Sequence, residues 1–394
     1  MGLKRLVEIE EIDDFYSSIN IIIQYPVSSI QQPVTSIQQP VSSIKSFGYL
    51  CKKFYKMIRF SENHSLKQHN TFGIEARAKY FFEFTDVEDL SVFLKSNETI
   101  SEEKILIIGE GSNILFLNDF DGLVIHPNLP GIQVVKEDRQ NIWMEVGAGE
   151  IWDEFVQYAV DYQLGGIENL SLIPGSVGAA PVQNIGAYGQ EVGNVVEKVK
   201  GFDLKNKMSL EFSAEQCEFG YRSSIFKSKL MNSFIITSVV FRLEKFPEFV
   251  LNYGQVEEKV KEKGEINLHS VRDAVIEIRQ SKLPDVKDLG NAGSFFKNPE
   301  VGVETAGKLK YQYENLPVYP TKPGLAKLAA GWLIEKAGWK GVREGDVGVH
   351  EKQALVLVNY GNSSGQQIYD FSEKIKQSVF EKFGVELERE VNCI

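Results

Sequence analysis

A glycine-rich loop set between two strand-like runs is the feature that most constrains how this chain can fold. The loop Gly109-Glu-Gly-Ser-Asn113 follows an apolar run at residues 105–108 and leads directly into a second apolar run at residues 114–117. A Rossmann phosphate turn needs a third glycine and a helix at this point. The strand that follows the loop therefore argues against that fold.

A second glycine-rich segment points to a dinucleotide ligand. Pro174-Gly-Ser-Val-Gly-Ala-Ala-Pro181 is followed closely by Gln183-Asn-Ile-Gly-Ala-Tyr-Gly189. Small residues let the backbone approach a ligand, and their N–H groups can cradle a pyrophosphate without a lysine. A plain connecting loop is the alternative, but the two glycine-rich segments together favour dinucleotide binding.

Hydrophobic periodicity predicts that strands and helices alternate along the chain. Thr85-Asp-Val-Glu88 has the pattern of a capping box that opens a helix, and Ser270 is expected to cap another helix that ends near Lys282. Further helices are predicted at residues 151–164, 325–336 and 368–383. Strands are predicted at residues 79–84, within 198–243, at 354–358 and at 385–391.

The stretch Asn291-Ala-Gly-Ser-Phe-Phe-Lys-Asn-Pro299 has the composition of a catalytic loop. Its small residues allow a ligand to approach, and they precede a single hydroxyl, Ser294, that two aromatic residues follow. The other interpretation is a glycine-containing turn into an edge strand that Pro299 ends. The stretch by itself does not decide between them.

Charged residues elsewhere offer partners for an anionic substrate. Arg222 lies between a tyrosine and two serines, where a guanidinium could fork onto an anion, although an exposed arginine beside a strand is the commoner case. The predicted last strand places Glu386, Glu388 and Glu390 on one face. Three like charges in a row usually form a solvated face, and nothing local distinguishes one of them.

Composition excludes several classes of protein. The 394 residues carry a net charge of −11, which gives no broad electrostatic footprint for nucleic acid. The three cysteines are far apart and the five histidines lack metal-ligand spacing, so neither a disulfide framework nor a metal site is predicted. Apolar runs are too short for a membrane span, and no signal peptide opens the chain, so a cytoplasmic protein is expected. Gly361-Asn-Ser-Ser-Gly365 matches a nucleophile elbow, but no histidine follows Ser363, which disfavours a hydrolase.

Residues 26–46 contain a seven-residue repeat that begins at Pro26, Pro33 and Pro40. A proline in every repeat removes helical hydrogen bonds, and one Val and one Ile per repeat bury too little to offset the ordering entropy. Residues 1–57 are therefore predicted to be a disordered extension, and Met57 is a candidate for the natural start.

Taken in order, these motifs resemble one family, the UDP-N-acetylenolpyruvoylglucosamine reductases (MurB) of bacterial peptidoglycan synthesis. The resemblance covers the chain from about residue 58 to its end. It is carried by Asn70-Thr-Phe-Gly73, Gly109 to Asn113, Pro174 to Gly178, Gln183 to Gly189, Phe219-Gly-Tyr-Arg222, Lys282-Leu-Pro284, Asn291 to Pro299, Ala330-Gly-Trp-Leu-Ile334 and Leu387-x-x-Glu390.

The resemblance implies an α+β fold with two parts. Residues 58–284 would form an FAD-binding domain of the vanillyl-alcohol-oxidase (PCMH) type, and residues 285–394 a smaller α+β substrate-binding domain. FAD would be held non-covalently, NADPH would be the hydride donor, and a cytoplasmic monomer is expected that binds neither nucleic acid nor membrane. The implied cofactor-binding residues are Gly109, Gly111, Ser112, Asn113, Gly175, Ser176, Gly178, Ala179, Gln183, Asn184, Gly186, Tyr188 and Arg279.

The implied reaction is the NADPH-dependent reduction of UDP-N-acetylglucosamine enolpyruvate to UDP-N-acetylmuramate. The family pattern implies that Ser294 is the proton donor. It also implies that Arg222 and Glu390 bind the enolpyruvyl carboxylate, with Glu390 protonated in that role. It implies substrate binding by Tyr253, on a loop that closes over the substrate, and by Lys282, Asn298 and Gln353. Alternatives are another FAD oxidoreductase of this fold and a flavin-binding protein without catalysis.

The chain departs from the family pattern at its C-terminal end. Asn392 stands where the family usually has an arginine, and the chain stops at Ile394 without the following glycine. This shortened tail is expected to loosen the strand that holds Glu390.

Overall fold

The computed structural model describes residues 59–97, 100 and 103–394, so the predicted extension and its repeats lie outside the described residues. The first sheet has four strands in the order β1-β2-β5-β3, in which β1 and β2 are antiparallel and the other pairs are parallel. Its strands are β1 (Arg59–Ser65), β2 (Arg77–Phe84), β3 (Ile105–Ile107) and β5 (Phe120–Pro127).

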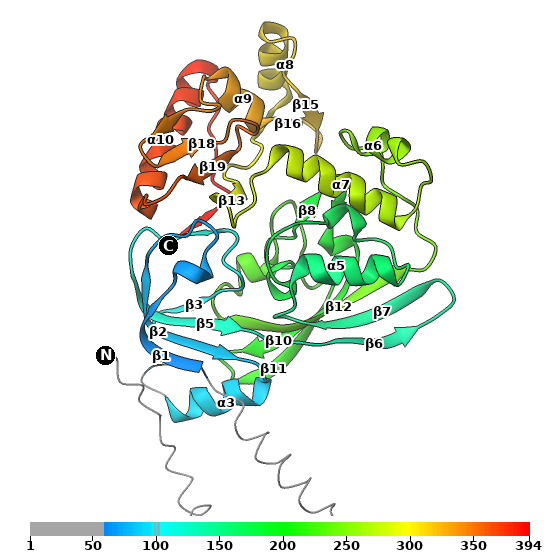
Figure 1. Ribbon diagram of the computed structural model, residues 1–394, viewed down its shortest axis with the longest axis vertical. Coiled ribbons are helices and arrows are strands. Elements are labelled where there is room, and N and C mark those ends of the chain that lie inside the picture. Colours follow the sequence, from blue (N-terminus) through cyan, green and yellow to red (C-terminus); the bar gives the residue numbers. More distant parts are fainter. Residues whose placement is uncertain (1–58, 98–99, 101–102) are drawn as a thin grey trace, which may run out of the picture.

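A five-stranded antiparallel sheet comes next, in the order β11-β10-β12-β7-β6. Helices α5 and α7 lie over one side of this sheet (Figure 1). The strands are β6 (Ile132–Glu137), β7 (Asn141–Gly147), β10 (Val196–Asp203), β11 (Met208–Ser213) and β12 (Phe234–Glu244). Among the described residues, the helices of this part are α3 (Val87–Ser96), α5 (Trp152–Asp161), α6 (Val256–Glu262) and α7 (Leu268–Lys282).

The C-terminal part has a four-stranded sheet, β13-β19-β18-β17, and a three-stranded sheet, β14-β16-β15. Their strands are β13 (Gly290–Ser294), β14 (Glu300–Gly302), β15 (Val318–Pro320), β16 (Leu325–Leu328), β17 (Arg343–Glu344), β18 (Val347–Val349) and β19 (Val356–Asn359). The helices here are α8 (Val303–Gln312), α9 (Ala330–Lys336) and α10 (Gly365–Phe383). Helices and sheets are thus mixed, and the predicted α+β class is confirmed.

Short elements complete the chain. Two two-stranded sheets pair β4 (Ile114–Leu115) with β20 (Asn392–Cys393) and β8 (Gly186–Ala187) with β9 (Gln190–Glu191). Single 3-10 turns are η3 (Lys67–His69), η4 (Glu168–Leu170), η5 (Val177–Ala179), η6 (Val192–Asn194) and η7 (Ile225–Lys227). No helix of the described residues is both long and apolar enough to span a membrane.

One hydrophobic core crosses the predicted domain boundary at residue 284. Buried side chains of the N-terminal part, such as Phe72 in the connection from β1 to β2 and Phe81 on β2, share a cluster with Phe295, Phe296 and the inward face of α10. A second cluster fills the space around the five-stranded sheet and α5. The strand that carries Ser294 is therefore packed against the N-terminal part of the chain, not only against its own sheet.

Four element predictions need correction. The side chain of Asp86, not Thr85, caps α3, and Asn267 caps α7, with Ser270 as its capping-box partner three residues on. Residues 325–328 form β16 because β14 and β15 flank and hydrogen-bond them, so the predicted helix begins only at α9. Residues 385–391 form no continuous strand. They pair with the segment after β13 only through an isolated bridge between Phe296 and Arg389. Regular strand pairing begins again at β20, which pairs with β4.

Candidate active site

A cavity of about 380 Å³ lies where both glycine-rich segments meet the C-terminal part of the chain. All three predicted catalytic residues line it: Arg222, Ser294 and Glu390. Of the predicted cofactor residues, Gly109, Gly111, Ser112, Asn113, Gly175, Ser176, Gly178, Ala179, Gln183, Gly186 and Arg279 also line it. Residues separated by up to 281 positions in the sequence thus share one cavity.

Close packing explains the glycines of the two loops. A Cβ on Gly109 would overlap the Ser176 hydroxyl, and a Cβ on Gly178 would lie 2.6 Å from that of Ala148. The loops are also joined by a hydrogen bond of 2.6 Å from Asn113 Nδ2 to Gln183 Oε1. The backbone of Gly109 therefore lies directly against Ser176, and that of Gly178 against Ala148, whose carbonyl accepts the Gly178 N–H at 2.9 Å. Glycine at these positions lets the two loops pack this closely on one wall of the cavity.

Gly111→Ala is expected to destabilise the protein strongly. Gly111 has φ +64°, and an added Cβ would collide with the backbone carbonyl of His69, which cannot move as a side chain can. We expect a loss of about 2–4 kcal/mol in the free energy of unfolding, measured by chemical denaturation. Gly73→Ala is the matched control, because Gly73 has φ +67° but open space around it. Equal losses in the two variants would show that backbone strain, not the collision, is responsible.

Ser294 is the last residue of β13, and the buried residues that follow it hold the strand in place. Gly293 has φ +66°, and the pairing of β13 with β19 shifts register between Asn291 and Ser294. Phe295 and Phe296, the next two residues, are fully buried in the shared core. The hydroxyl is thus presented to the cavity by a bulged strand whose next two side chains fix its position.

Arg222 and Glu390 are in direct contact in the lining of the cavity. Arg222 Nε lies 2.8 Å from Glu390 Oε1, with both side chains largely buried. The N–H is not directed at that oxygen, so the contact is an ion pair, and Nε has no well-aligned hydrogen bond among the described residues. Nη2 donates to the Gly186 carbonyl at 2.7 Å. The guanidinium is therefore oriented by the second glycine-rich segment and carries a buried donor that a ligand can use.

Comparison with known proteins shows which family has a similar sequence. A family model described as the C-terminal domain of UDP-N-acetylenolpyruvoylglucosamine reductase matches residues 284–394, and one described as an FAD binding domain matches residues 78–206. The reductase of that name from Flavobacterium johnsoniae is 46% identical over 340 residues, which cover 86% of this chain and 100% of the relative. The one from Amoebophilus asiaticus is 47% identical over 335 residues, 84% and 98% of the two chains.

The chain belongs to the UDP-N-acetylenolpyruvoylglucosamine reductase family. The resemblance noted in the sequence is confirmed by these relatives. The solved structure of UDP-N-acetylenolpyruvylglucosamine reductase (MurB) from Thermus caldophilus has a TM-score of 0.59 and 24% identity, and it covers 86% of this chain and 98% of its own. That likeness supports the fold alone.

The cavity suits the FAD that this reductase family uses. Arg279 lines it, and Arg279 Nε is buried without a hydrogen-bond partner among the described residues. Burial lowers the pKa of the Arg279 guanidinium, although Tyr188 and Asp153 oppose the shift. A buried donor without a partner in the protein is suited to an acceptor on a ligand, and the pyrophosphate of FAD carries such acceptors.

Two predicted cofactor residues of the reductase do not line this cavity. The side chain of Asn184 instead donates to Glu191 and to the Gly220 carbonyl, and accepts from Gly193, so it braces the second glycine-rich segment. Tyr188 meets Tyr253 edge to face, with ring centroids 6.3 Å apart. Their assignment to FAD stays a prediction.

The predicted substrate residues of the reductase also lie outside the cavity. Tyr253 is half exposed in the loop before α6, and Lys282 is the last residue of α7. Asn298 Oδ1 accepts from the N–H of Ala330 at 2.9 Å, which fixes the start of α9. Gln353 lies beside the same helix, because a Cβ on Gly331 would be 3.2 Å from its Oε1. Asn298 and Gln353 thus come together at one end of α9.

The cavity also contains residues that were not predicted to belong to the site. Lys227 lines it, and burial followed by the charge of Lys297 lowers the pKa of its ammonium group. The available signal was its position five residues after Arg222, at the end of the stretch Phe219-Gly-Tyr-Arg-Ser-Ser-Ile-Phe-Lys227. Asn392 and Ile394 line it as well. Both belong to the tail that was expected to be loose.

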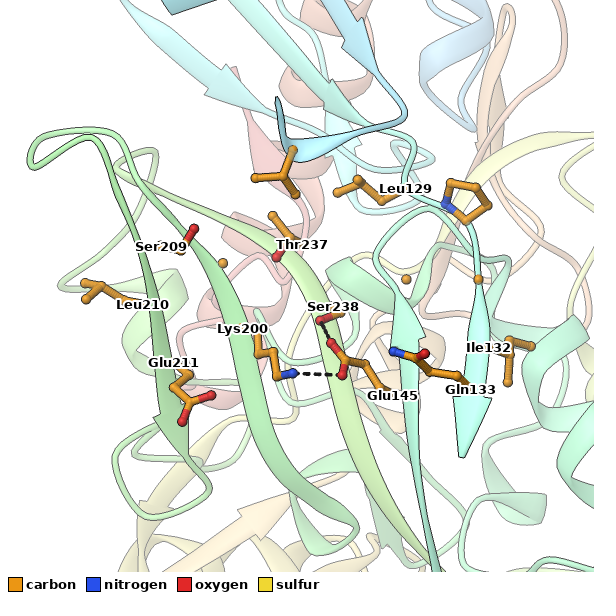
Figure 2. A pocket seen from close by; sticks show the side chains of 15 residues that line it. Leu129, Ile132, Gln133, Glu145, Lys200, Ser209, Leu210, Glu211, Thr237 and Ser238 are labelled. Atoms are coloured by element: carbon orange, nitrogen blue, oxygen red, sulfur yellow. Dashed lines mark hydrogen bonds and ion pairs between the residues drawn. The ribbon is translucent and has the colours of Figure 1, made fainter. Parts of the chain in front are cut away.

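A larger hollow of about 660 Å³ lies over the five-stranded sheet (Figure 2). Glu145, one of its charged residues, accepts from Lys200 Nζ at 2.8 Å and from Ser238 Oγ at 2.7 Å. That carboxylate is already neutralised within the protein, and no predicted site residue of the reductase lies there. The smaller cavity, in which charges and donors converge, is therefore the candidate active site.

Proposed function

We propose that this chain reduces UDP-N-acetylglucosamine enolpyruvate to UDP-N-acetylmuramate with NADPH and FAD, a step of bacterial peptidoglycan synthesis. The observation that carries the proposal is the meeting of Ser294, Arg222 and Glu390 in one cavity with both glycine-rich segments. An oxidase of a small alcohol would not need these three groups together. A flavin-binding protein without catalysis would not need Ser294.

The glycine-rich segments and Arg279 would hold FAD non-covalently. Backbone N–H groups of the loop Gly109 to Asn113 and of Gly175 and Ser176 would donate to its phosphates, and the buried guanidinium would complete the binding. The N–H groups of Val177 and Gly178 are already used, because they donate to the carbonyls of Glu150 and Ala148. When bound, FAD supplies the hydride chemistry, accepting a hydride from NADPH and delivering one to the enolpyruvyl group. The remaining task of the protein is to make an alkene accept that hydride.

Arg222, Glu390 and Ser294 would perform that task. Negative charge builds on the enolpyruvyl carboxylate as the hydride arrives, and preorganised donors beside it lower the barrier. Arg222 and Glu390 would bind and polarise this carboxylate, and Lys227 adds a second cation to the same wall. Ser294 would then give its proton to the adjacent carbon. A serine hydroxyl is a weak acid, so this step requires the strongly basic enolate to be held against it.

The other assignments complete the proposal. Tyr253, Lys282, Asn298 and Gln353 would bind the sugar nucleotide, with the Tyr253 loop closing over it. The cofactor part would comprise residues 58–284 and the substrate part residues 285–394, in spite of the core that they share. The protein would act as a cytoplasmic monomer.

The test is the oxidation of NADPH by the purified holoenzyme, followed at the NADPH absorbance with and without UDP-N-acetylglucosamine enolpyruvate. We expect consumption to depend on this substrate and to match the UDP-N-acetylmuramate formed. Consumption of NADPH at the same rate without the substrate would reject the proposal and favour another FAD oxidoreductase. Bound flavin without any NADPH oxidation would favour a non-catalytic protein.

A further inference from the structure

The peptide groups of Glu390 bridge the two halves of the cavity. Its N–H donates to the carbonyl of Phe295, the residue after Ser294, at 2.8 Å. Its carbonyl accepts from Asn113 Nδ2, on the first glycine-rich loop, at 3.2 Å. The backbone that carries the Glu390 carboxylate is thus tied on one side to the proton-donor strand and on the other to the cofactor loop.

Asn113 is the centre of this connection. Besides Glu390, its amide reaches Gln183 of the second glycine-rich segment. Its own carbonyl accepts two hydrogen bonds from Asn392, one from the backbone N–H at 3.1 Å and one from Nδ2 at 3.0 Å. The two asparagines therefore face each other, and Glu390 lies two residues before Asn392.

The tail beyond Asn392 continues the pairing along β4. Ile394 N donates to the Leu115 carbonyl at 2.9 Å, and Leu117 N donates to the Ile394 carbonyl at 2.7 Å. Upstream of Glu390, Leu387 is buried in the shared core, and so is Val391 directly after Glu390. Burial fixes the segment up to Val391, and Cys393 and Ile394 pack half-buried against the same core. Asn392 is exposed, so this residue is held by its pairing with β4 and its hydrogen bonds to Asn113.

We propose that Asn113 and Asn392 form a clasp that holds Glu390 against Arg222, and that Asn392 is a positioning residue for reduction of the enolpyruvyl group. The proposal rests on the proposed function. Asn392 is exposed at the surface, so its side chain has no part in the core, and its contribution comes from the hydrogen bond to Asn113.

The test compares holoenzymes that carry Asn392→Ala, Asn392→Gln and Asn206→Ala. Asn392→Ala removes the side-chain donor and leaves the backbone pairing in place, and Asn392→Gln restores an amide on a longer arm. Asn206 is the control, because it is also exposed and makes a hydrogen bond with Nδ2, to Asp203 in the turn before β11, outside the candidate active site. Reduction of FAD by NADPH and oxidation of the reduced enzyme by substrate are measured separately, together with hydrogen exchange of the tail amides.

For Asn392→Ala we expect oxidation by substrate to slow by about 3- to 10-fold, the range that one neutral hydrogen bond supports. FAD content and reduction by NADPH should stay within about twofold of the wild type, and the amides of Asn392 and Ile394 should exchange faster by a similar 3- to 10-fold. Asn392→Gln should recover most of the rate, and Asn206→Ala should change none of these quantities.

Unchanged oxidation with faster exchange would overturn the proposal, because the tail would then move without displacing Glu390. Equal slowing of both half-reactions, or loss of FAD, would also overturn it in favour of a general structural role. Unchanged exchange would mean that the clasp does not hold the tail. A wild-type enzyme that oxidises NADPH regardless of substrate would instead reject the proposed function, and the exchange rates would still report on the clasp itself.

Discussion

Ser294→Ala is expected to slow oxidation of the reduced enzyme by UDP-N-acetylglucosamine enolpyruvate by about 10³-fold, within the range of a general acid. The hydroxyl is the proposed proton donor, and alanine fits the same bulged strand without disturbing Phe295 behind it. Reduction of FAD by NADPH should stay near normal, because no proton is delivered to the substrate in that half-reaction. Stopped-flow absorbance of the flavin measures both steps separately.

Ser363→Ala is the matched control for this substitution. Ser363 is a buried serine of the same C-terminal part, and its Oγ has no hydrogen-bond partner among the described residues. Its replacement should leave both half-reactions unchanged. This result would also show that the nucleophile-elbow pattern at residues 361–365 has no part in the reaction. If Ser294→Ala slowed both half-reactions equally, Ser294 would have a structural role and another group would deliver the proton.

Arg222→Lys is expected to lower kcat/KM for the enolpyruvyl substrate by about 10²- to 10³-fold, the cost of losing one preorganised donor at a developing charge. The guanidinium reaches the Gly186 carbonyl with Nη2 while Nε lies beside Glu390. A lysine keeps the charge but has a single nitrogen, so it cannot meet both groups and a substrate carboxylate. Reduction by NADPH should change by less than about threefold.

Arg343→Lys provides the comparison. Arg343 also contacts a backbone carbonyl, that of Gly345, and a carboxylate, that of Asp346, but it lies at the surface away from the cavity. The same chemical change there should leave the kinetics unaltered. Normal oxidation of the Arg222→Lys enzyme by substrate would show that a positive charge alone suffices. The proposed role of the branched guanidinium would then be wrong.

The local elements were largely predictable because they follow from short-range patterns. The helix α10 carries Ile368, Phe371, Ile375 and Val379 at helical spacing and ends at Gly384, which has φ +66° as a left-handed cap requires. The strand after the first glycine loop was also expected, and β4 confirms it. The prediction was wrong at residues 325–328, where pairing with two neighbouring strands outweighed the helical pattern.

The choice among three glutamates shows what the sequence could not decide. Glu386, Glu388 and Glu390 alternate along one extended segment, and any of them could have faced the site. Glu386 and Glu388 are exposed, and Glu388 is paired with Lys297, whereas Glu390 enters the cavity beside Arg222. The difference arises because the segment crosses from the Ser294 strand to the first glycine loop at Glu390.

The sequence by itself determined the glycine loops, the family motifs and the residue types that the chemistry needs, since these depend on local conformation and on the identity of side chains. Only the tertiary structure decided which charged side chains lie next to each other in the cavity. Asn113 meets Glu390 and Asn392 across 277 and 279 positions of the chain, and Phe72 shares a core with Phe295. Hydrogen bonds and burial between segments so distant leave no periodic trace in the sequence, because each depends on how the whole chain packs.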